Sequence, residues 1–171
     1  MRIFLTGFMG SGKTTLGAKL ASKLSYPFID LDKKIEEEAG MSIREYFGLH
    51  GENTFRELEK KVLQNAAYPE NAVIATGGGA PCFFDNMDWM NKNGVTIYLS
   101  MPPNALANRL EKGKDERPLI KDLSRDELVD FIASKLEQRN PFYQQAKYIL
   151  EGSNITAAKV TEFLKEKGIL I

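Results

Sequence analysis

The sequence is poor in the residues from which disulfides and histidine- or cysteine-based metal centres are built. Among its 171 residues there are one cysteine and one histidine. Cys82 has no partner for an intrachain disulfide, so a reducing compartment is favoured and the side chain is predicted to be a small apolar filler. A metal site would need further His or Cys ligands, so His50 is predicted to be an ordinary surface or loop histidine.

An excess of charge of one sign and long hydrophobic runs are also missing. The formal net charge is zero, which argues against nucleic acid or an anionic membrane as a partner. No apolar run approaches the ~18 residues of a membrane-spanning helix, and residues 1–6 lead into a strand without the pattern of a signal peptide. With 43% hydrophobic residues, the chain is expected to form one cytoplasmic domain with a buried core.

Short apolar runs alternate along the chain with longer amphipathic stretches. The runs predicted as strands are 2–6, 27–30, 72–76, 95–100 and 148–150. The stretches predicted as helices are 13–24, 53–67, 103–110, 126–139 and 154–167, the last capped by Ser153 or Asn154. Strands joined by helical crossovers form parallel sheets with helices on both faces. The prediction is therefore an α/β fold with a five-stranded parallel sheet, whose ligands bind beyond the carboxyl ends of the strands.

Two charged stretches fit neither pattern. Residues 112–124, KGKDERPLIKDLS, are broken by a glycine and a proline, and long excursions of this kind are often lids. Residues 32–51 form a charged helical insert after the second strand, interrupted by three glycines. Composition alone leaves open whether either stretch is functional or a solvated surface segment.

A phosphate-binding loop is the strongest signal in the chain. Residues 7–14, GFMGSGKT, satisfy the pattern G-x-x-x-x-G-K-[ST], with a strand before them and an amphipathic helix after them. The glycines let successive N–H groups point at phosphate oxygens, and the helix adds its positive N-terminal end. Lys13 would then reach the β- and γ-phosphates, and the Thr14 hydroxyl would bind Mg²⁺. The chain is predicted to bind a nucleoside triphosphate.

The sequence favours a kinase over a switch or a motor. A GTPase is expected to carry Asn-Lys-x-Asp after a strand, whereas the nearest string, NKNG at 91–94, precedes a strand. The third strand leads into TGGG at 76–79, without the Asp-x-x-Gly that would sense the γ-phosphate. A motor or large ATPase would carry an apolar strand ending in Asp-Glu and would be longer. A kinase requires a second pocket beside the γ-phosphate.

Two aspartates at the end of the second predicted strand would begin that pocket. Asp30 and Asp32 are two residues apart, so in an extended chain they would face the same side at roughly 6–7 Å. One carboxylate could hold waters of Mg²⁺, while the other would accept or orient the proton of an acceptor hydroxyl.

Three arginines and a glycine run would complete the pocket. Arg56, Arg117 and Arg139 are candidates to hold a carboxylate or phosphate through paired N–H bonds. Glu59 lies on the same helix face as Arg56 and could fix its rotamer. The glycines of TGGG at 76–79 imply a backbone that approaches a ligand closely. From the residues alone, the chain is predicted to be a kinase of a small hydroxylated anion.

The motifs together resemble the shikimate kinase family over essentially the whole chain. The strings that carry the resemblance are, in order, GFMGSGKTT, DLD, GENTFRELE, GGG, RPLI and RNPFY. The resemblance implies a P-loop nucleotide kinase-like fold and transfer of the γ-phosphate of ATP to the 3-hydroxyl of shikimate. The product, shikimate 3-phosphate, would serve chorismate and aromatic amino-acid biosynthesis.

The resemblance also implies a role for individual residues. ATP would be bound by Gly10, Ser11, Gly12, Lys13, Thr14, Thr15, Arg109 and Arg117. Shikimate would be bound by Asp32, Arg56, Gly77, Gly78, Gly79 and Arg139. The catalytic residues would be Lys13, Asp32 and Arg117. Mg²⁺ would be held by Thr14, with Asp30 in its outer shell.

The whole chain, 1–171, would be one kinase domain by the same resemblance. Its phosphate loop would be at 7–15, a substrate-binding insert at about 32–60 and a lid at about 111–124. Asn154, in EGSNIT, is a candidate for the adenine contact. A monomer is expected, with ATP and shikimate as the only partners.

Two alternatives stay open at this point. Another small-molecule kinase, such as a gluconate kinase, would also bind hydroxyls and a carboxylate. A non-catalytic ATP-binding module would keep the phosphate loop, although Lys13, Asp32 and Arg117 together argue against loss of transfer.

Overall fold

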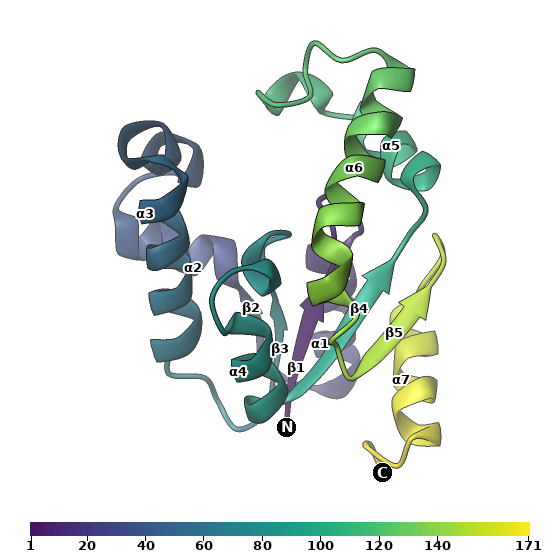
Figure 1. Ribbon diagram of the computed structural model, residues 1–171. Coiled ribbons are helices and arrows are strands. Elements are labelled where there is room, and N and C mark those ends of the chain that lie inside the picture. Colours follow the sequence, from purple (N-terminus) through teal and green to yellow (C-terminus); the bar gives the residue numbers. More distant parts are fainter.

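Five parallel strands form one sheet in the order β2-β3-β1-β4-β5, as Figure 1 shows for the computed structural model, which describes residues 1–171. The strands are β1 (Arg2–Thr6), β2 (Phe28–Asp30), β3 (Ala72–Ala75), β4 (Val95–Ser100) and β5 (Tyr148–Glu151). The predicted α/β class with a five-stranded parallel sheet is therefore confirmed.

Helices cover both faces of this sheet. The α-helices are α1 (Lys13–Leu24), α2 (Leu31–Ala39), α3 (Ile43–Asn65), α4 (Asn86–Asn93), α5 (Pro103–Glu111), α6 (Arg125–Tyr143) and α7 (Ala157–Glu166). The short 3₁₀ helices are η1 (Ala80–Cys82) and η2 (Lys114–Glu116). None of the helices combines the length and the apolar character that crossing a membrane requires.

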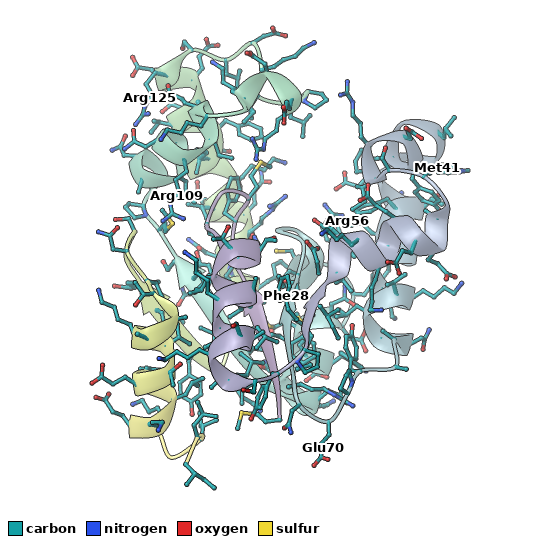
Figure 2. The ribbon with its side chains drawn as sticks, turned by 180° about the vertical axis from the view of Figure 1, so that it is seen from behind. Phe28, Met41, Arg56, Glu70, Arg109 and Arg125 are labelled. Atoms are coloured by element: carbon teal, nitrogen blue, oxygen red, sulfur yellow. The ribbon has the colours of Figure 1, made fainter.

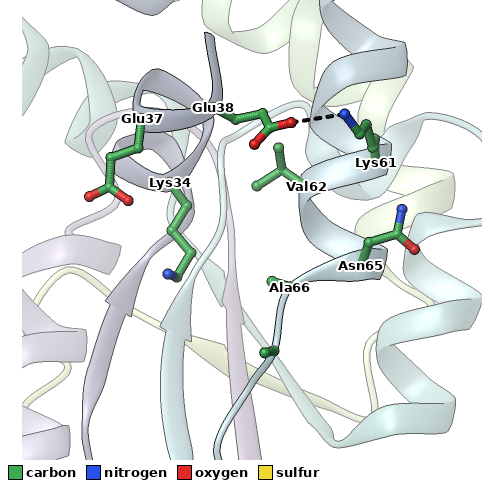
Figure 3. A pocket seen from close by; sticks show the side chains of 8 residues that line it. Lys34, Glu37, Glu38, Lys61, Val62, Asn65 and Ala66 are labelled. Carbon is green, nitrogen blue, oxygen red and sulfur yellow. Dashed lines mark hydrogen bonds and ion pairs between the residues drawn. The ribbon is translucent and has the colours of Figure 1, made fainter. Parts of the chain in front are cut away.

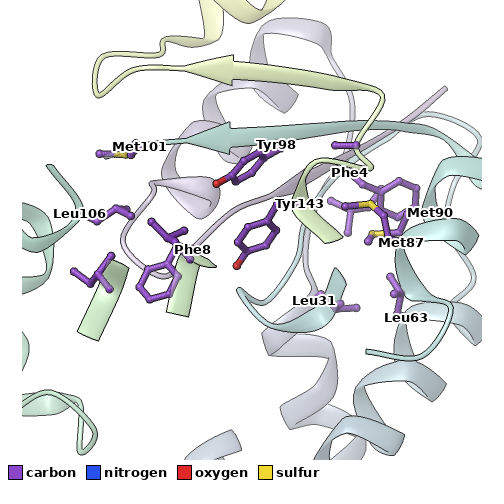
Figure 4. Close-up of a cluster of buried hydrophobic side chains, with 14 of the residues drawn as sticks. Phe4, Phe8, Leu31, Leu63, Met87, Met90, Tyr98, Met101, Leu106 and Tyr143 are labelled. Carbon is purple, nitrogen blue, oxygen red and sulfur yellow. The ribbon is translucent and has the colours of Figure 1, made fainter. Parts of the chain in front are cut away.

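The central strand β1 divides the core in two because successive side chains point to opposite faces. Ile3 and Leu5 pack with α1 and α7, whereas Phe4 packs with the larger cluster under α2–α6. Figure 4 shows part of that larger cluster, in which Phe4 lies near Met87 and Met90 of α4. Burial on both faces explains why β1 is a nearly continuous apolar run.

The strand register brings the two glycine-rich turns together. Leu5 of β1 lies opposite Ala75 of β3 and Ile97 of β4. The phosphate loop after β1 and the glycine run after β3 therefore emerge side by side at the carboxyl edge of the sheet. This is the edge at which parallel α/β sheets bind ligands.

Several predicted helix boundaries are wrong, each for a physical reason. The helix expected at 53–67 is the second half of α3, which begins at Ile43 and continues across a kink at Gly51 (φ 79°, ψ 176°). Helix α6 does not end at 139 but runs through Pro141 to Tyr143. Helix α7 is capped by Thr156, whose side chain accepts from the Lys159 N–H, and not by Ser153 or Asn154.

Helix α4 was not predicted at all. Its sequence, NMDWMNKN, is short and rich in weak helix formers, and its N-terminus has no side-chain cap. The helix nevertheless forms where Met87 and Met90 become buried in the core. Tertiary packing, not local propensity, therefore decides this element.

The charged stretch 112–124 has more internal structure than its composition indicates. It contains η2, and Ile120 is fully buried within the larger core cluster. The Lys114 ammonium donates to the Leu123 carbonyl at 2.6 Å. At its end, Ser124 and Glu127 form a reciprocal capping box that begins α6. In Figure 1 this stretch and α2–α3 flank the carboxyl edge of the sheet from different sides.

Tyr143 connects α6 to the glycine run. Its ring is fully buried and stacks on Tyr98 of β4, with centroids 4.7 Å apart. Its hydroxyl donates to the Gly78 carbonyl at 2.5 Å. This contact fixes the last turns of α6, which carry Arg139, against the turn after β3.

Replacing Tyr143 with phenylalanine should lower the free energy of unfolding by about 1–2 kcal/mol, because the half-buried Gly78 carbonyl loses its donor. Urea unfolding followed by circular dichroism would measure the change. The matched control is Tyr26→Phe, which removes a hydroxyl that makes no hydrogen bond within the chain. Equal stabilities of the two variants would contradict the assigned role of the Tyr143 hydroxyl.

Candidate functional site

The phosphate loop lies between β1 and α1 in the expected conformation. Gly12, the N-cap of α1, has a left-handed backbone (φ 89°), and a Cβ there would lie 2.8 Å from a guanidinium nitrogen of Arg109. Only glycine accepts both conditions without strain. The Lys13 ammonium is buried and donates to the carbonyls of Gly7 at 2.6 Å and Phe8 at 3.0 Å. The loop therefore holds the positive charge of Lys13 within hydrogen-bond distance of its own backbone carbonyls.

The charged groups that shift the pKa of Lys13 are its neighbours in space. Burial lowers the pKa of Lys13 to about 8. The carboxylates of Asp32 and Asp30 oppose this decrease, whereas Arg139 adds to it. The structure thus places three predicted site residues near the phosphate-loop lysine, although they come from distant parts of the chain.

The predicted geometry of the two aspartates is wrong. Asp32 does not continue an extended strand, because α2 begins at Leu31, immediately after β2. Asp30 is the N-cap of α2, and its carboxylate accepts the Asp32 N–H at 3.0 Å. Asp32 opens onto a cavity, yet desolvation by the surrounding protein raises its pKa, and the negative charge of Asp30 raises it further. Capping of the helix, not strand alternation, sets the relative positions of the two carboxylates.

The glycine run after β3 is the place where the predicted substrate residues meet. A Cβ on Gly77 would lie 3.1 Å from carboxylate oxygens of both Asp32 and Glu59. A Cβ on Gly79 would lie only 2.6 Å from the terminal nitrogens of Arg56.

The middle glycine, Gly78, completes this meeting point. A Cβ there would lie 3.5 Å from a guanidinium nitrogen of Arg139 and 3.2 Å from the backbone N of Met9 in the phosphate loop. Side chains from α2, α3 and α6 therefore converge on a backbone that has no side chains of its own.

Arg56 is held by an ion pair inside this pocket. One of its terminal nitrogens lies 2.9 Å from the Glu59 carboxylate, which is 1% exposed, and the other lies 3.6 Å from Glu52. Burial raises the pKa of Glu59, and the Arg56 charge partly offsets the increase. The predicted support of Arg56 by Glu59 is thus present in the structure. Figure 2 shows Arg56 and Arg109 on opposite sides of α1.

Arg117 faces the same cavity as Asp32. The cavity, of about 470 Å³, is lined by Met9, Asp32, Glu36, Ile43, Arg44, Glu116, Arg117, Pro118, Leu119 and Ile120. It therefore lies between the phosphate loop, the start of α2 and α3, and the stretch predicted as a lid. The Arg117 guanidinium donates to the Gly113 carbonyl at 3.0 Å. Glu36 and Arg44 belong to no recognised motif, so the sequence did not point to them.

A second cavity, of about 270 Å³, lies on the other side of the phosphate loop. It is lined by Ser11, Gly12, Thr15, Leu16, Lys19, Arg109, Gly152, Ser153, Ile155, Thr156 and Ala157. Arg109 closes one side, donating to the Ser153 carbonyl at 2.5 Å. Asn154, the predicted adenine contact, does not line this cavity, whereas its neighbours on both sides do. The β5–α7 connection thus contributes to this cavity, while the adenine contact of Asn154 stays a prediction.

A third cavity shares no residue with either site. It measures about 400 Å³ and lies between α2 and α3, lined by Lys34, Glu37, Glu38, Lys61, Val62, Asn65, Ala66 and Ala67 (Figure 3). Two of its lining residues, Glu38 and Lys61, form an ion pair of 2.8 Å. Both side chains are largely exposed, so this pair contributes little to stability.

The donors available for a metal are oxygen atoms. Thr14 is exposed in the first turn of α1, and Asp30 ends β2 at the same edge of the sheet. Together with phosphate oxygens, a hydroxyl and a carboxylate suit Mg²⁺, which prefers hard oxygen ligands and retains several waters. The residues present therefore fit the predicted ion.

Comparisons with known proteins agree with this geometry. A family model described as shikimate kinase matches residues 9–167. A shikimate kinase of Bacteroides fragilis is 54% identical over 149 residues, covering 87% of this chain and 83% of the relative.

Solved structures give the same result. A crystal structure of shikimate kinase from Bacteroides thetaiotaomicron superposes with a TM-score of 0.91 at 47% identity, covering 98% of each chain. The structure of shikimate kinase from Acinetobacter baumannii in complex with shikimate gives a TM-score of 0.81 at 33% identity, covering 98% of this chain and 92% of that one.

The raised pKa of Glu59 predicts a specific dependence of stability on pH. Because the native state holds this proton more tightly than the unfolded chain, ionisation of Glu59 opposes folding. The contribution is absent below the ordinary pKa of 4.5 and grows as the pH rises through the raised value. The wild type should therefore lose stability relative to Glu59→Gln as the pH increases through this range.

Urea unfolding at a series of pH values would measure this difference. Glu57→Gln, on the exposed side of the same helix, is the matched control and should follow the wild type. Parallel stability curves for wild type and Glu59→Gln would contradict the assigned cost of burying the carboxylate.

Proposed function

This chain belongs to the shikimate kinase family, and on that premise we propose which residues perform its reaction, the phosphorylation of shikimate by ATP. The observation that carries the proposal is the convergence of Asp32, Arg56 and Arg139 on the glycine run 77–79, beside the phosphate loop. The acceptor is the 3-hydroxyl, and the product is shikimate 3-phosphate, a step of chorismate and aromatic amino-acid biosynthesis.

Arg56 and Arg139 bind the carboxylate of shikimate. Both guanidinium groups lie against the glycine run. A Cβ at Gly79 would lie 2.6 Å from the terminal nitrogens of Arg56, and a Cβ at Gly78 would lie 3.5 Å from one of Arg139. Glycine at 77–79 lets the substrate ring approach the backbone in the remaining space. Paired N–H donors recognise a planar carboxylate better than a point charge does.

Asp32 orients the acceptor hydroxyl and takes its proton. Its raised pKa makes the carboxylate a stronger base than an exposed aspartate. As the acceptor oxygen bonds to the γ-phosphorus, the bond from that phosphorus to the bridging oxygen of ADP breaks. The proton of the hydroxyl passes to Asp32 in the same process.

Lys13 and Arg117 neutralise charge on the phosphoryl group during transfer. Lys13 is placed by the phosphate loop, and Arg117 by the stretch of about 111–124, which acts as the lid. The insert of about 32–60 forms the opposite wall and closes over shikimate. The cavity between these walls contains Asp32 and Arg117 together, which supports this division of labour.

ATP occupies the loop residues Gly10, Ser11, Gly12, Lys13, Thr14 and Thr15, with its base in the cavity beside Arg109. Thr14 and Asp30 would hold Mg²⁺, which would supply charge neutralisation at the phosphates. We further propose a cytoplasmic monomer, in keeping with the single free cysteine.

The reaction is tested by coupled ADP release with Mg-ATP and shikimate, gluconate or no acceptor. We expect turnover that depends on shikimate. In the same assay Asp32→Asn should lower kcat by about 10²–10⁴-fold, the usual contribution of a general base. Asp130→Asn, an exposed aspartate on α6, is the matched control. Turnover with gluconate alone would overturn the acceptor, and normal kcat in Asp32→Asn would overturn the role of that residue.

Arg139→Ala should weaken shikimate binding strongly while leaving ATP affinity nearly unchanged, because Arg139 does not line the cavity beside Arg109 that is proposed for the base of ATP. Loss of a charged hydrogen bond of about 1.5–3 kcal/mol corresponds to a rise in Kd of roughly 10–150-fold. Isothermal titration with each ligand would measure both effects. Lys135→Ala, one turn earlier in α6, is the control, and equal losses for both ligands would mean that Arg139 is structural.

A further inference from the structure

We propose that Phe83 is a positioning residue for shikimate binding, which acts by holding the guanidinium of Arg56 against its ring. The inference rests on the proposed role of Arg56 in binding the substrate carboxylate. Neither the phosphate loop nor the recognised motifs of the pocket include Phe83, which lies just after η1.

Phe83 and Arg56 make a close cation–π contact. The guanidinium carbon of Arg56 lies over the Phe83 ring, 4.2 Å from its centroid, and 5.2 Å from the centroid of Phe55. The Arg56 side chain is 11% exposed. A cation over an aromatic face in a partly desolvated place is stabilised more strongly than at an exposed surface.

Hydrogen bonds alone do not fix the orientation of Arg56. Its terminal nitrogens face Glu59 and Glu52, but its Nε is buried without a hydrogen-bond partner. The flat faces of the guanidinium therefore need another support. The Phe83 ring provides it without using any N–H group, so in-plane donors remain for a carboxylate.

The backbone around Phe83 is built to present this ring. Phe84 has a left-handed backbone (φ 52°), which is uncommon for a bulky residue and costs conformational energy. This turn separates the two neighbouring rings. Phe83 lies on Arg56, whereas Phe84 is 55% exposed beside the ammonium of Lys60.

The turn is anchored to the core immediately afterwards. Asn86 is fully buried and donates to the Ala80 carbonyl at 2.9 Å. Gln64 of α3 donates to the side chains of Asp85 and Asn86, at 2.9 and 3.0 Å. The stretch from η1 to α4 is thus tied at both ends, and the Phe83 ring is a fixed platform, not a free surface side chain.

Steady-state kinetics of Phe83→Leu would test the proposal. We expect the KM for shikimate to rise by about tenfold, the scale of a partly buried cation–π contact. The KM for ATP and kcat should stay near the wild-type values. Phe83→Met, which is closer to phenylalanine in size, should behave like Phe83→Leu. Phe83→Tyr, which keeps an aromatic ring, should have the wild-type KM for shikimate. Phe84→Leu, the exposed neighbour, is the matched control and should have no effect.

A double variant separates this inference from the proposed function. In an Arg56→Met background, Phe83→Leu should add no further rise in the shikimate KM, because its effect passes through Arg56. If Arg56→Met alone leaves the shikimate KM unchanged, the proposed role of Arg56 fails. If Arg56→Met raises it but Phe83→Leu and Phe83→Met do not, only the role of Phe83 is overturned. The role of Phe83 would also be overturned by additive effects in the double variant, or by equal rises of the KM for shikimate and the KM for ATP in Phe83→Leu.

Discussion

The absence of side chains at Gly77–Gly79 is the constraint on which the site depends. A Cβ at the first or last of these positions would press against the carboxylates of Asp32 and Glu59 or the guanidinium of Arg56. These charged groups come from two helices, α2 and α3, and can meet only where the backbone leaves space. The same turn lies beside the phosphate loop because β1 and β3 are neighbours in the sheet. The close approach of this backbone and the charged side chains thus places the proposed acceptor site next to the phosphate loop.

Burying so many charges is tolerable only because each has a partner of opposite sign or an aromatic face. Glu59 is paired with Arg56, and Asp32 stands in the field of Lys13. Desolvation still shifts the pKa of Glu59 and Asp32 upward and that of Lys13 downward. Such shifts are common where groups must exchange or neutralise charge, and Asp32 and Lys13 are both residues proposed for phosphoryl transfer.

The elements that the sequence predicted well are those with a strong local signal. The phosphate loop and β1 follow from a fixed string and an apolar run, and both are where the pattern places them. Helix α4 was missed because its sequence is short and polar. It becomes helical through burial of residues such as Met90. Asp32 was assigned to an extended strand because the spacing of DLD does not reveal that a helix begins at Leu31.

The sequence by itself determined the fold class, the nucleotide loop and the charged groups available for an acceptor anion, because these depend on local patterns and residue chemistry. Only the tertiary structure decided which groups touch. The Tyr143 hydroxyl reaches Gly78 across 65 residues of sequence, and Arg109 reaches Ser153 across 44. The ring of Phe83 meets Arg56 only because α3 and the turn after β3 pack together. Such contacts depend on how distant elements pack, which no short stretch of sequence encodes.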